Sequence, residues 1–163
     1  VQEQNVGVDC GYDPERAATL RHRYRKDVIQ NGKTVGYACW VLMKGDQEQR
    51  GFPHPGTEKL KLWAPPKQTK TSDQLDYSFV RVATKLVKDK LAALIKTGSF
   101  QVPRDASPTY RKHAAAEHKV EVSPGVYRWV AVRKNAPDHL RDCEVGNVAL
   151  AAMRGILKQI DEK

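Results

Sequence analysis

A near-continuously apolar run at Thr34–Met43, TVGYACWVLM, limits the possible folds of this chain most strongly. Such a run is typical of a strand that is covered on both faces, as the strands of parallel sheets are. The chain before it contains another candidate strand, Val6–Cys10, which we expect to be buried, and a candidate helix that begins at Asp13. The order strand, helix, strand predicts a right-handed βαβ unit, and therefore an α/β fold.

The remainder of the chain alternates loops with shorter elements. We expect loops at Gln47–Gly56 and Pro65–Asp76, because turn-forming and charged residues predominate there. Hydrophobic periodicity predicts strands at Lys59–Trp63, Tyr77–Val82 and Ser99–Val102, and helices at Lys85–Thr97 and Ser107–Ala116. A Ser-Pro-Gly turn separates two further segments and predicts a β-hairpin with basic outward positions, formed by Val120–Val122 and Tyr127–Val132.

The stretch Pro137–Met153 predicts a final helix that continues to about Ile160, because small and apolar residues recur at helical spacing. Asp138 lies where an N-cap is expected. Asp142 falls one turn into the helix beside an apolar face, where an unpaired buried carboxylate would be costly. The helix dipole alone also favours an acid in the first turn, so this helix by itself does not establish a functional site.

The charge balance favours a polyanionic partner. The chain has 28 Lys and Arg residues against 19 Asp and Glu residues, a net charge of +9. Nucleic acid is the first expectation and a membrane surface the second, although a solvated surface can have the same composition. No apolar run approaches the ~20 residues that a membrane-spanning helix needs. Three scattered cysteines without zinc-type spacing favour a reduced intracellular compartment.

Three aspartates lie at the ends of predicted elements and could form a metal site. Asp9 ends the first strand, Asp46 follows the second, and Asp142 begins the final helix. Carboxylates that converge at one end of a sheet repel each other, and a hard divalent cation would relieve that repulsion. Two such ions can stabilise the attacking and leaving oxygens of a phosphodiester. Spacing alone is a weak signal, and the chain has no phosphate-binding loop, dinucleotide fingerprint or serine-hydrolase motif.

A family resemblance is carried by the ordered segments VGVDCGY, YACWVLMKG, ATKLVKDKLAALI, TYRKHAAAEHKVE and YRWVAVRKNAPDHLRDCEV. Together they resemble the C-terminal nuclease region of the large terminase subunit of lambda-like tailed bacteriophages. The resemblance implies one RNase H-like domain over residues 1–163, with a mixed central sheet flanked by helices and a basic β-hairpin before the C-terminal helix. It also implies that the domain is part of a longer chain with an upstream ATPase. The implied activity is metal-dependent endonucleolytic cutting of concatemeric double-stranded viral DNA during genome packaging.

The resemblance also implies roles for the aspartates. It places Asp142 at the acid of the family's final helix and Asp9 at an acid that ends a central strand. These residues would bind Mg²⁺ or Mn²⁺, as two ions, with Asp46 as a weaker candidate. The family's first metal-binding Asp usually lies on an earlier strand. Either that part of the chain has been removed, or Asp9 takes the first role and Asp46 the second.

The implied partners are double-stranded DNA, the terminase small subunit and the portal, in the cytoplasm of the infected bacterial host, with no membrane partner. Basic and imidazole side chains would contact the DNA backbone without reading sequence: Arg21, Arg25, Lys44, Arg128, Arg133, Lys134 and His139. An alternative is a nucleic-acid-binding module of the same fold that lacks a ligand acid and does not cut. A third hypothesis is a structural protein that docks to capsid or portal components.

Overall fold

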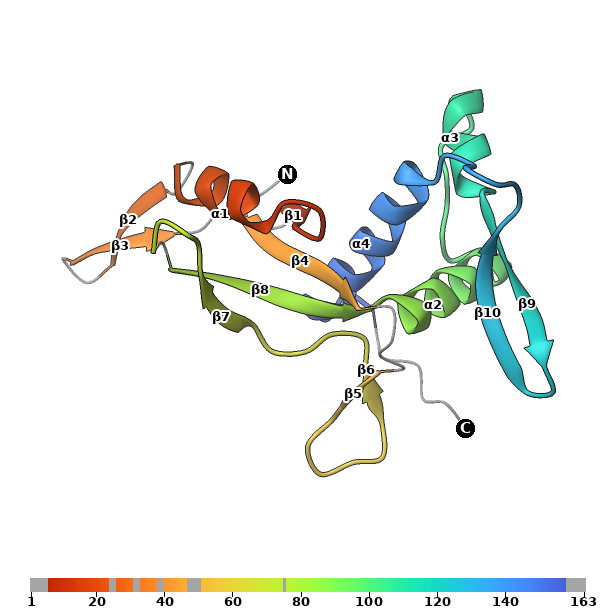
Figure 1. The fold of residues 1–163 in the computed structure, drawn as a ribbon, viewed down its shortest axis with the longest axis horizontal. Coiled ribbons are helices and arrows are strands. Elements are labelled where there is room, and N and C mark those ends of the chain that lie inside the picture. Colours follow the sequence, from red (N-terminus) through yellow and green to blue (C-terminus); the bar gives the residue numbers. More distant parts are fainter. Residues whose placement is uncertain are drawn as a thin grey trace.

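The structure is a computed structural model that describes residues 6–23, 26–30, 33–37, 40–46, 51–74 and 76–157. This part of the chain has a mixed α/β fold with four helices (Figure 1), which are α1 (Pro14–Arg23), α2 (Thr84–Lys96), α3 (Pro108–Ala114) and α4 (His139–Met153). The strands are β1 (Val6–Asp9), β2 (Lys26–Gln30), β3 (Lys33–Tyr37), β4 (Trp40–Asp46), β5 (Phe52–Pro53), β6 (Leu60–Lys61), β7 (Lys67–Lys70), β8 (Asp76–Ala83), β9 (Glu117–Ser123) and β10 (Val126–Ala131). None of the described helices is long and apolar enough to cross a membrane.

The central sheet has the strand order β1-β4-β8-β7. β4 pairs in parallel with both β1 and β8, whereas β7 pairs antiparallel with β8. In this register Asp9 is the partner of Met43, and Asp46 is the partner of Ala83. The prediction of an α/β fold with a mixed sheet is therefore confirmed at the level of fold class.

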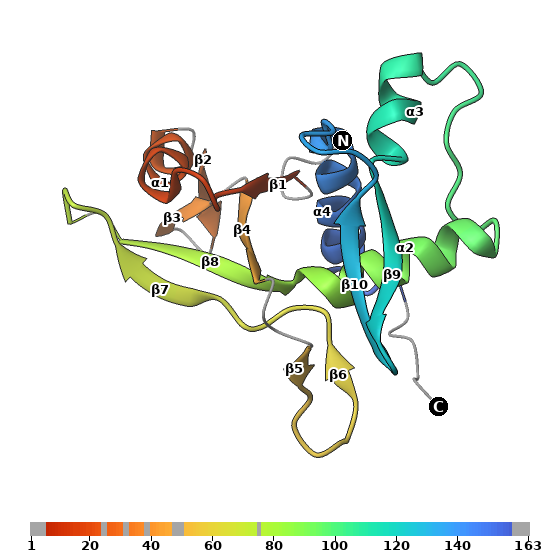
Figure 2. The same cartoon turned by 45° about the vertical axis from the view of Figure 1, so that its right-hand side comes forward.

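Helices cover the two faces of this sheet, because adjacent residues of β4 point to opposite sides. Leu42 packs with Ala17 and Ala18 of α1 in one buried cluster. Met43 belongs to a different cluster, which includes Val145 of α4. Figure 2 shows α1 and α4 on either side of β1 and β4. We refer to these sides below as the α1 face and the α4 face.

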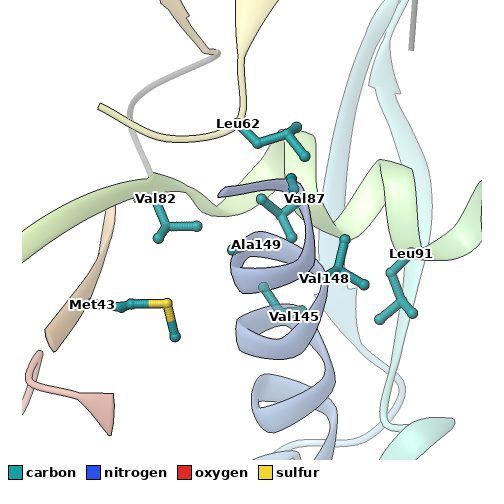
Figure 3. Packing of buried hydrophobic residues seen from close by; sticks show 9 residues of the cluster. Met43, Leu62, Val82, Val87, Leu91, Val145, Val148 and Ala149 are labelled. Carbon is teal, nitrogen blue, oxygen red and sulfur yellow. The ribbon is translucent and has the colours of Figure 1, made fainter. Parts of the chain in front are cut away.

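Helix α4 also packs against α2, so a single buried cluster joins the sheet to both helices. Val87 and Leu91 of α2 are 0% and 2% exposed, and they share that cluster with Val148 and Ala149 of α4. Figure 3 shows these side chains in one group with Met43. Tight burial of this kind makes α4 the element that fixes the helical layer against the sheet.

The helix α3 and the β9–β10 hairpin follow their predicted positions. Ser107 caps α3 by accepting a hydrogen bond from the backbone N–H of Tyr110 (3.1 Å), and Pro108 is the first helical residue. β9 and β10 pair antiparallel, and Gly125 occupies the turn with φ +73°. Both predictions rest on short-range turn and capping chemistry, which acts independently of the remaining fold.

The interpretation of Thr34–Met43 as one buried strand is wrong. Its first part belongs to β3, which forms an antiparallel hairpin with β2, and its last part begins β4 at Trp40. The connection from β1 to β4 thus contains a helix and a hairpin. The predicted burial of Val6–Cys10 is correct only in part, because β1 forms an edge of the central sheet: Val8 is half-buried and Cys10 is 1% exposed, whereas the rest of the strand is exposed. An apolar run shows that segments are apolar and leaves open how many strands they make.

Several smaller predictions also differ from the structure. β5 lies in the predicted loop Gln47–Gly56 and β7 in the predicted loop Pro65–Asp76, while residues 47–50 lie outside the described residues. Lys59–Trp63 contains only the short β6 and an isolated bridge from Trp63 to Val82. Ser99–Val102 forms no strand, because the backbone N–H groups of Ser99 and Phe100 bond to the carbonyl oxygen of Leu94 at the end of α2.

The final helix ends at Met153, earlier than the predicted Ile160, which itself lies outside the described residues. Gly155 has φ +71°, and its N–H bonds to the carbonyl oxygen of Ala152 (3.1 Å). The N–H of Ile156 bonds to the carbonyl oxygen of Ala151 (2.9 Å). This pair of bonds is a Schellman motif, which glycine favours because a left-handed residue must follow the helix.

Candidate functional site

Asp9 ends β1 on the α4 face of the sheet. It lies two residues after Gly7, at which an added Cβ would meet the side chains of Met43 and Leu150, so both positions are on the α4 face. The Asp9 side chain is exposed, and its Oδ1 accepts a hydrogen bond from the backbone N–H of Gly11 (2.8 Å). The turn after β1 thus orients the carboxylate.

Asp142 lies in the first turn of α4, on the same side of the sheet as Asp9. Asp142 is exposed by its accessible surface, but the protein atoms around its carboxyl group displace part of its hydration, and this desolvation is the main cause that raises its pKa. The negative charges of Asp138, Glu117 and Asp9 raise this pKa further, while the positive charge of Lys88 opposes them. Asp9 makes the smallest of these contributions, so Asp9 and Asp142 lie on the same face of the sheet and interact only weakly through their charges.

Asp138 contributes the largest of these charge effects on Asp142, and sequence reasoning assigned it a different role. It occupies the N-cap position of α4, as predicted, but its side chain makes no capping hydrogen bond. Instead the Nδ1 atom of His113 accepts from the backbone N–H of Leu140 (3.4 Å). The sequence contained one signal that Asp138 lies near Asp142: the two residues are four apart, and residues four apart lie on the same side of a helix.

Asp46 does not lie on the same face of the sheet as Asp9 and Asp142. Asp46 is four residues after Leu42 on β4, and because side chains alternate along a strand, both lie on the α1 face. Its Oδ2 is 3.9 Å from Nη1 of Arg81. Its partner in the register is Ala83, whereas Asp9 is aligned with Met43, three residues earlier along β4. At about 3.3 Å per residue, that offset places Asp46 roughly 10 Å further along the strand direction.

The donor chemistry of Asp9 and Asp142 is suitable for a hard divalent cation, which prefers carboxylate oxygens and would offset the repulsion between like charges. Within the described ranges, no group of three or more His, Cys, Asp or Glu side chains has an arrangement that could hold a metal ion. The candidate site thus consists of two carboxylates, with Asp138 next to Asp142.

A charged network beside this site joins three elements that sequence reasoning did not connect. Glu117 of β9 accepts from Nζ of Lys88 at 2.6 and 2.7 Å and from Nε of Arg141 at 3.1 Å. The three side chains are only 7–12% exposed. Arg141 also donates to the carbonyl oxygen of Ala114 (2.7 Å). No sequence pattern indicates this network, because its members come from α2, β9 and α4.

Trp129 anchors the hairpin to the same network. The guanidinium of Arg141 lies 4.8 Å from the centre of the indole ring, and the indole N–H donates to Oδ1 of Asp89 (3.0 Å). Asp89 also pairs with Lys119 of β9 at 2.9 Å. Because side chains alternate along a strand, Arg128 points away from this anchored face.

Two of the predicted DNA contacts lie on the α1 face, away from Asp142. Arg21 is half-buried and donates to the carbonyl oxygen of Ser78 (3.2 Å), and burial lowers the pKa of its guanidinium. Lys44 is exposed and lies 6.0 Å from the centre of the Phe79 ring. Arg25 lies outside the described residues.

The other predicted contacts lie on the hairpin, on the connection from it to α4, and at the first residue of α4. Arg128 is exposed on β10, and His139 is the exposed first residue of α4, with its ring centre 6.1 Å from that of His113. Arg133 and Lys134 are exposed on the connection between β10 and α4. Arg133 and Lys134 therefore precede the helix turn that contains His139 and Asp142, whereas Arg128 lies on the hairpin and points away from Arg141.

The fold and site together define a mixed α/β protein with a carboxylate pair beside a basic surface. Comparisons with protein-family models, with curated proteins and with solved structures found no match to this chain. The terminase resemblance and the RNase H-like fold therefore stay predictions.

Proposed function

We propose that this chain is a divalent-metal-dependent endonuclease domain that cuts double-stranded DNA and has an RNase H-like fold. The observation that carries the proposal is the placement of Asp9, at the end of β1, on the face of the sheet that α4 covers, together with Asp142 in the first turn of α4. The charge of Asp9 raises the pKa of Asp142, so both carboxylates would gain from a shared cation.

In this proposal Asp9 and Asp142 hold Mg²⁺ or Mn²⁺, as one ion or two. When bound, such an ion supplies an activated water and stabilises negative charge on the phosphate. The chain's own residues orient the two carboxylates through the Asp9–Gly11 hydrogen bond and the first turn of α4. Exposed cations near the start of α4 hold the DNA backbone through its phosphates.

The biological setting that we propose is genome packaging in a tailed bacteriophage. The support is the ordered set of segments that resembles the nuclease region of the large terminase subunit. The substrate is then concatemeric viral DNA in the cytoplasm of the infected bacterium, and the small subunit and the portal are partners.

A second candidate is a DNA-binding module that does not cut. The observation that favours it is the small number of converging acids, because no group of three or more potential ligands forms among the described residues and Asp46 lies on the opposite face. The two candidates share the basic surface and differ in whether phosphodiester bonds are broken.

The first experiment measures nicking of supercoiled plasmid by the wild-type chain in Mg²⁺ or Mn²⁺, with and without EDTA. We expect cutting that EDTA abolishes, and we expect Asp142→Asn to lose more than the about 10–100-fold that removal of an outer-shell partner costs. Asp105→Asn is the matched control, because Asp105 is an exposed loop acid.

The outcomes separate the candidates. A gel mobility shift without nicks, in either metal, supports the DNA-binding module. Cutting by Asp142→Asn at the wild-type rate removes Asp142 from the mechanism, and cutting that persists in EDTA contradicts metal dependence.

A further inference from the structure

A basic pocket of about 390 Å³ lies between the end of α3 and the connection from β10 to α4. This volume is within the ~300–1,000 Å³ that is usual for ligand pockets. Residues of the last turn of α3, the α3–β9 connection and the β10–α4 connection line it: Lys112, Ala115, Ala116, Val132, Arg133, Lys134, Asn135, Ala136 and Pro137.

Backbone hydrogen bonds shape this pocket. The N–H of Val132 bonds to the carbonyl oxygen of Ala116 (2.8 Å), and the N–H of Ala136 bonds to that of Arg133 (3.0 Å). Asn135 has φ +58°, as the third residue of a type II turn requires, and asparagine tolerates this conformation better than most residues. The turn that carries Arg133 and Lys134 is therefore defined by the backbone.

All the charge that lines the pocket is positive. Lys112, Arg133 and Lys134 contribute three cations, and no acidic side chain is part of the lining. Within the part of the chain that the structure describes, none of these three side chains forms an ion pair. Exposed cations that line one pocket without a counter-charge repel each other, and a bound anion would relieve that repulsion.

We propose that this pocket binds a backbone phosphate of double-stranded DNA and so places the duplex beside Asp142. The pocket ends at Pro137, and Asp142 follows within the first turn of α4. Lys112, on α3, is a contact that sequence reasoning did not predict. The position of the duplex next to the carboxylates rests on the proposed nuclease function, whereas the binding of phosphate by the pocket does not.

The test measures the salt dependence of binding to a fluorescein-labelled 20-base-pair duplex by anisotropy, in EDTA. The slope of log Kobs against log [salt] is negative, and each lost phosphate contact reduces its magnitude by about 0.9. We expect this change for Lys112→Gln and for Arg133→Gln, to the same extent with two unrelated duplex sequences. Lys96→Gln is the charge-matched control, because Lys96 is exposed on α2 and does not line the pocket.

Equal slopes for the Lys112→Gln and Lys96→Gln proteins, both folded by circular dichroism, would overturn the assignment. Inorganic phosphate provides the second arm, at constant ionic strength. Displacement of the duplex by phosphate beyond that by chloride, reduced in Lys112→Gln and retained in Lys96→Gln, supports a phosphate site at the pocket. Displacement by phosphate that is unchanged in Lys112→Gln, or no displacement, would overturn the assignment of that site to this pocket.

Failure of this inference is distinguishable from failure of the proposed function. If the wild-type chain never cuts plasmid, but Lys112→Gln reduces the magnitude of the salt slope, the pocket assignment stands and the nuclease proposal fails. If metal-dependent cutting requires Asp142, but Lys112→Gln leaves the salt slope unchanged, the nuclease proposal stands and the pocket assignment fails.

Discussion

Asp142 is held at a position where its ionised form is disfavoured. Its pKa lies above the usual value of 3.8, mainly because the protein displaces part of the hydration of this exposed residue and then because of nearby negative charge. A folded state that raises the pKa of an acid binds the proton more tightly than the unfolded chain does. The ionised carboxylate therefore lowers stability, and this cost is common at positions that are retained for function.

The first prediction at this scale concerns pH. Because the pKa of Asp142 is raised, stability is lost as the pH rises from 3.8 through the folded-state pKa, and the loss is complete above it. We expect the Asp142→Asn protein in EDTA to have a higher urea midpoint than wild type at pH 7. The difference should narrow as the pH falls toward 3.8.

Mn²⁺ provides the corresponding readout of metal binding. It should raise the urea midpoint of wild type at pH 7 and leave that of Asp142→Asn unchanged, because a ligand that binds only the folded state stabilises it. Asp105→Asn should follow wild type under all of these conditions. A lower midpoint for Asp142→Asn than for wild type in EDTA at pH 7 would contradict the electrostatic explanation.

At the scale of elements, the hairpin is joined to the helical layer by charge as well as by apolar contact. Glu117 compensates both Lys88 and Arg141, and all three side chains are largely buried. A buried ion pair contributes little net stability compared with apolar packing, but loss of one partner leaves an uncompensated buried charge. The network therefore makes the position of the hairpin sensitive to one residue.

We predict that Glu117→Gln lowers the free energy of unfolding by about 3–5 kcal/mol, measured by urea titration, because it leaves Lys88 and Arg141 with too little negative charge. Glu58→Gln, at an exposed loop position, should stay within about 0.5 kcal/mol of wild type. If the two variants were equally stable, the network would have no structural role.

At the scale of the whole molecule, α4 connects the sheet to α2 through one buried cluster. Met43 of the sheet, Leu91 of α2 and Val145 of α4 all belong to it. Loss of apolar volume at its centre should therefore weaken the sheet and the helical layer together, rather than one of them alone.

Leu91→Ala should cost about 2–5 kcal/mol, because it opens a cavity in this cluster. The midpoints measured by far-UV circular dichroism and by tryptophan fluorescence should fall together, since Trp63 and Trp129 report on different parts of the fold. Ile95→Ala is the control on the same helix, at a side chain that is 52% exposed, and should cost clearly less. Separate transitions for the two probes would show that the sheet and the helical layer unfold independently.

Local chemistry made part of this architecture predictable. The prediction of α2 at Lys85–Thr97 is displaced by one residue from the observed Thr84–Lys96, and α3 begins at Pro108 after its Ser107 cap, as expected. These elements depend on residues close in sequence. The division of Thr34–Met43 between two sheets was not predictable, because it depends on which strands pair, and that is decided by distant segments.

The amino-acid sequence alone predicted the fold class, the basic character, the turn and capping signals, and the aspartates at the ends of elements. The arrangement of distant segments was needed to show which aspartates share a face of the sheet. The strand register and the alternation of side chains along β4 place Asp46 on the α1 face, while the packing of α4 places Asp142 on the same face as Asp9. The physical reason is that side-chain composition and periodicity are local, whereas charges converge only where distant backbone segments are fixed against each other.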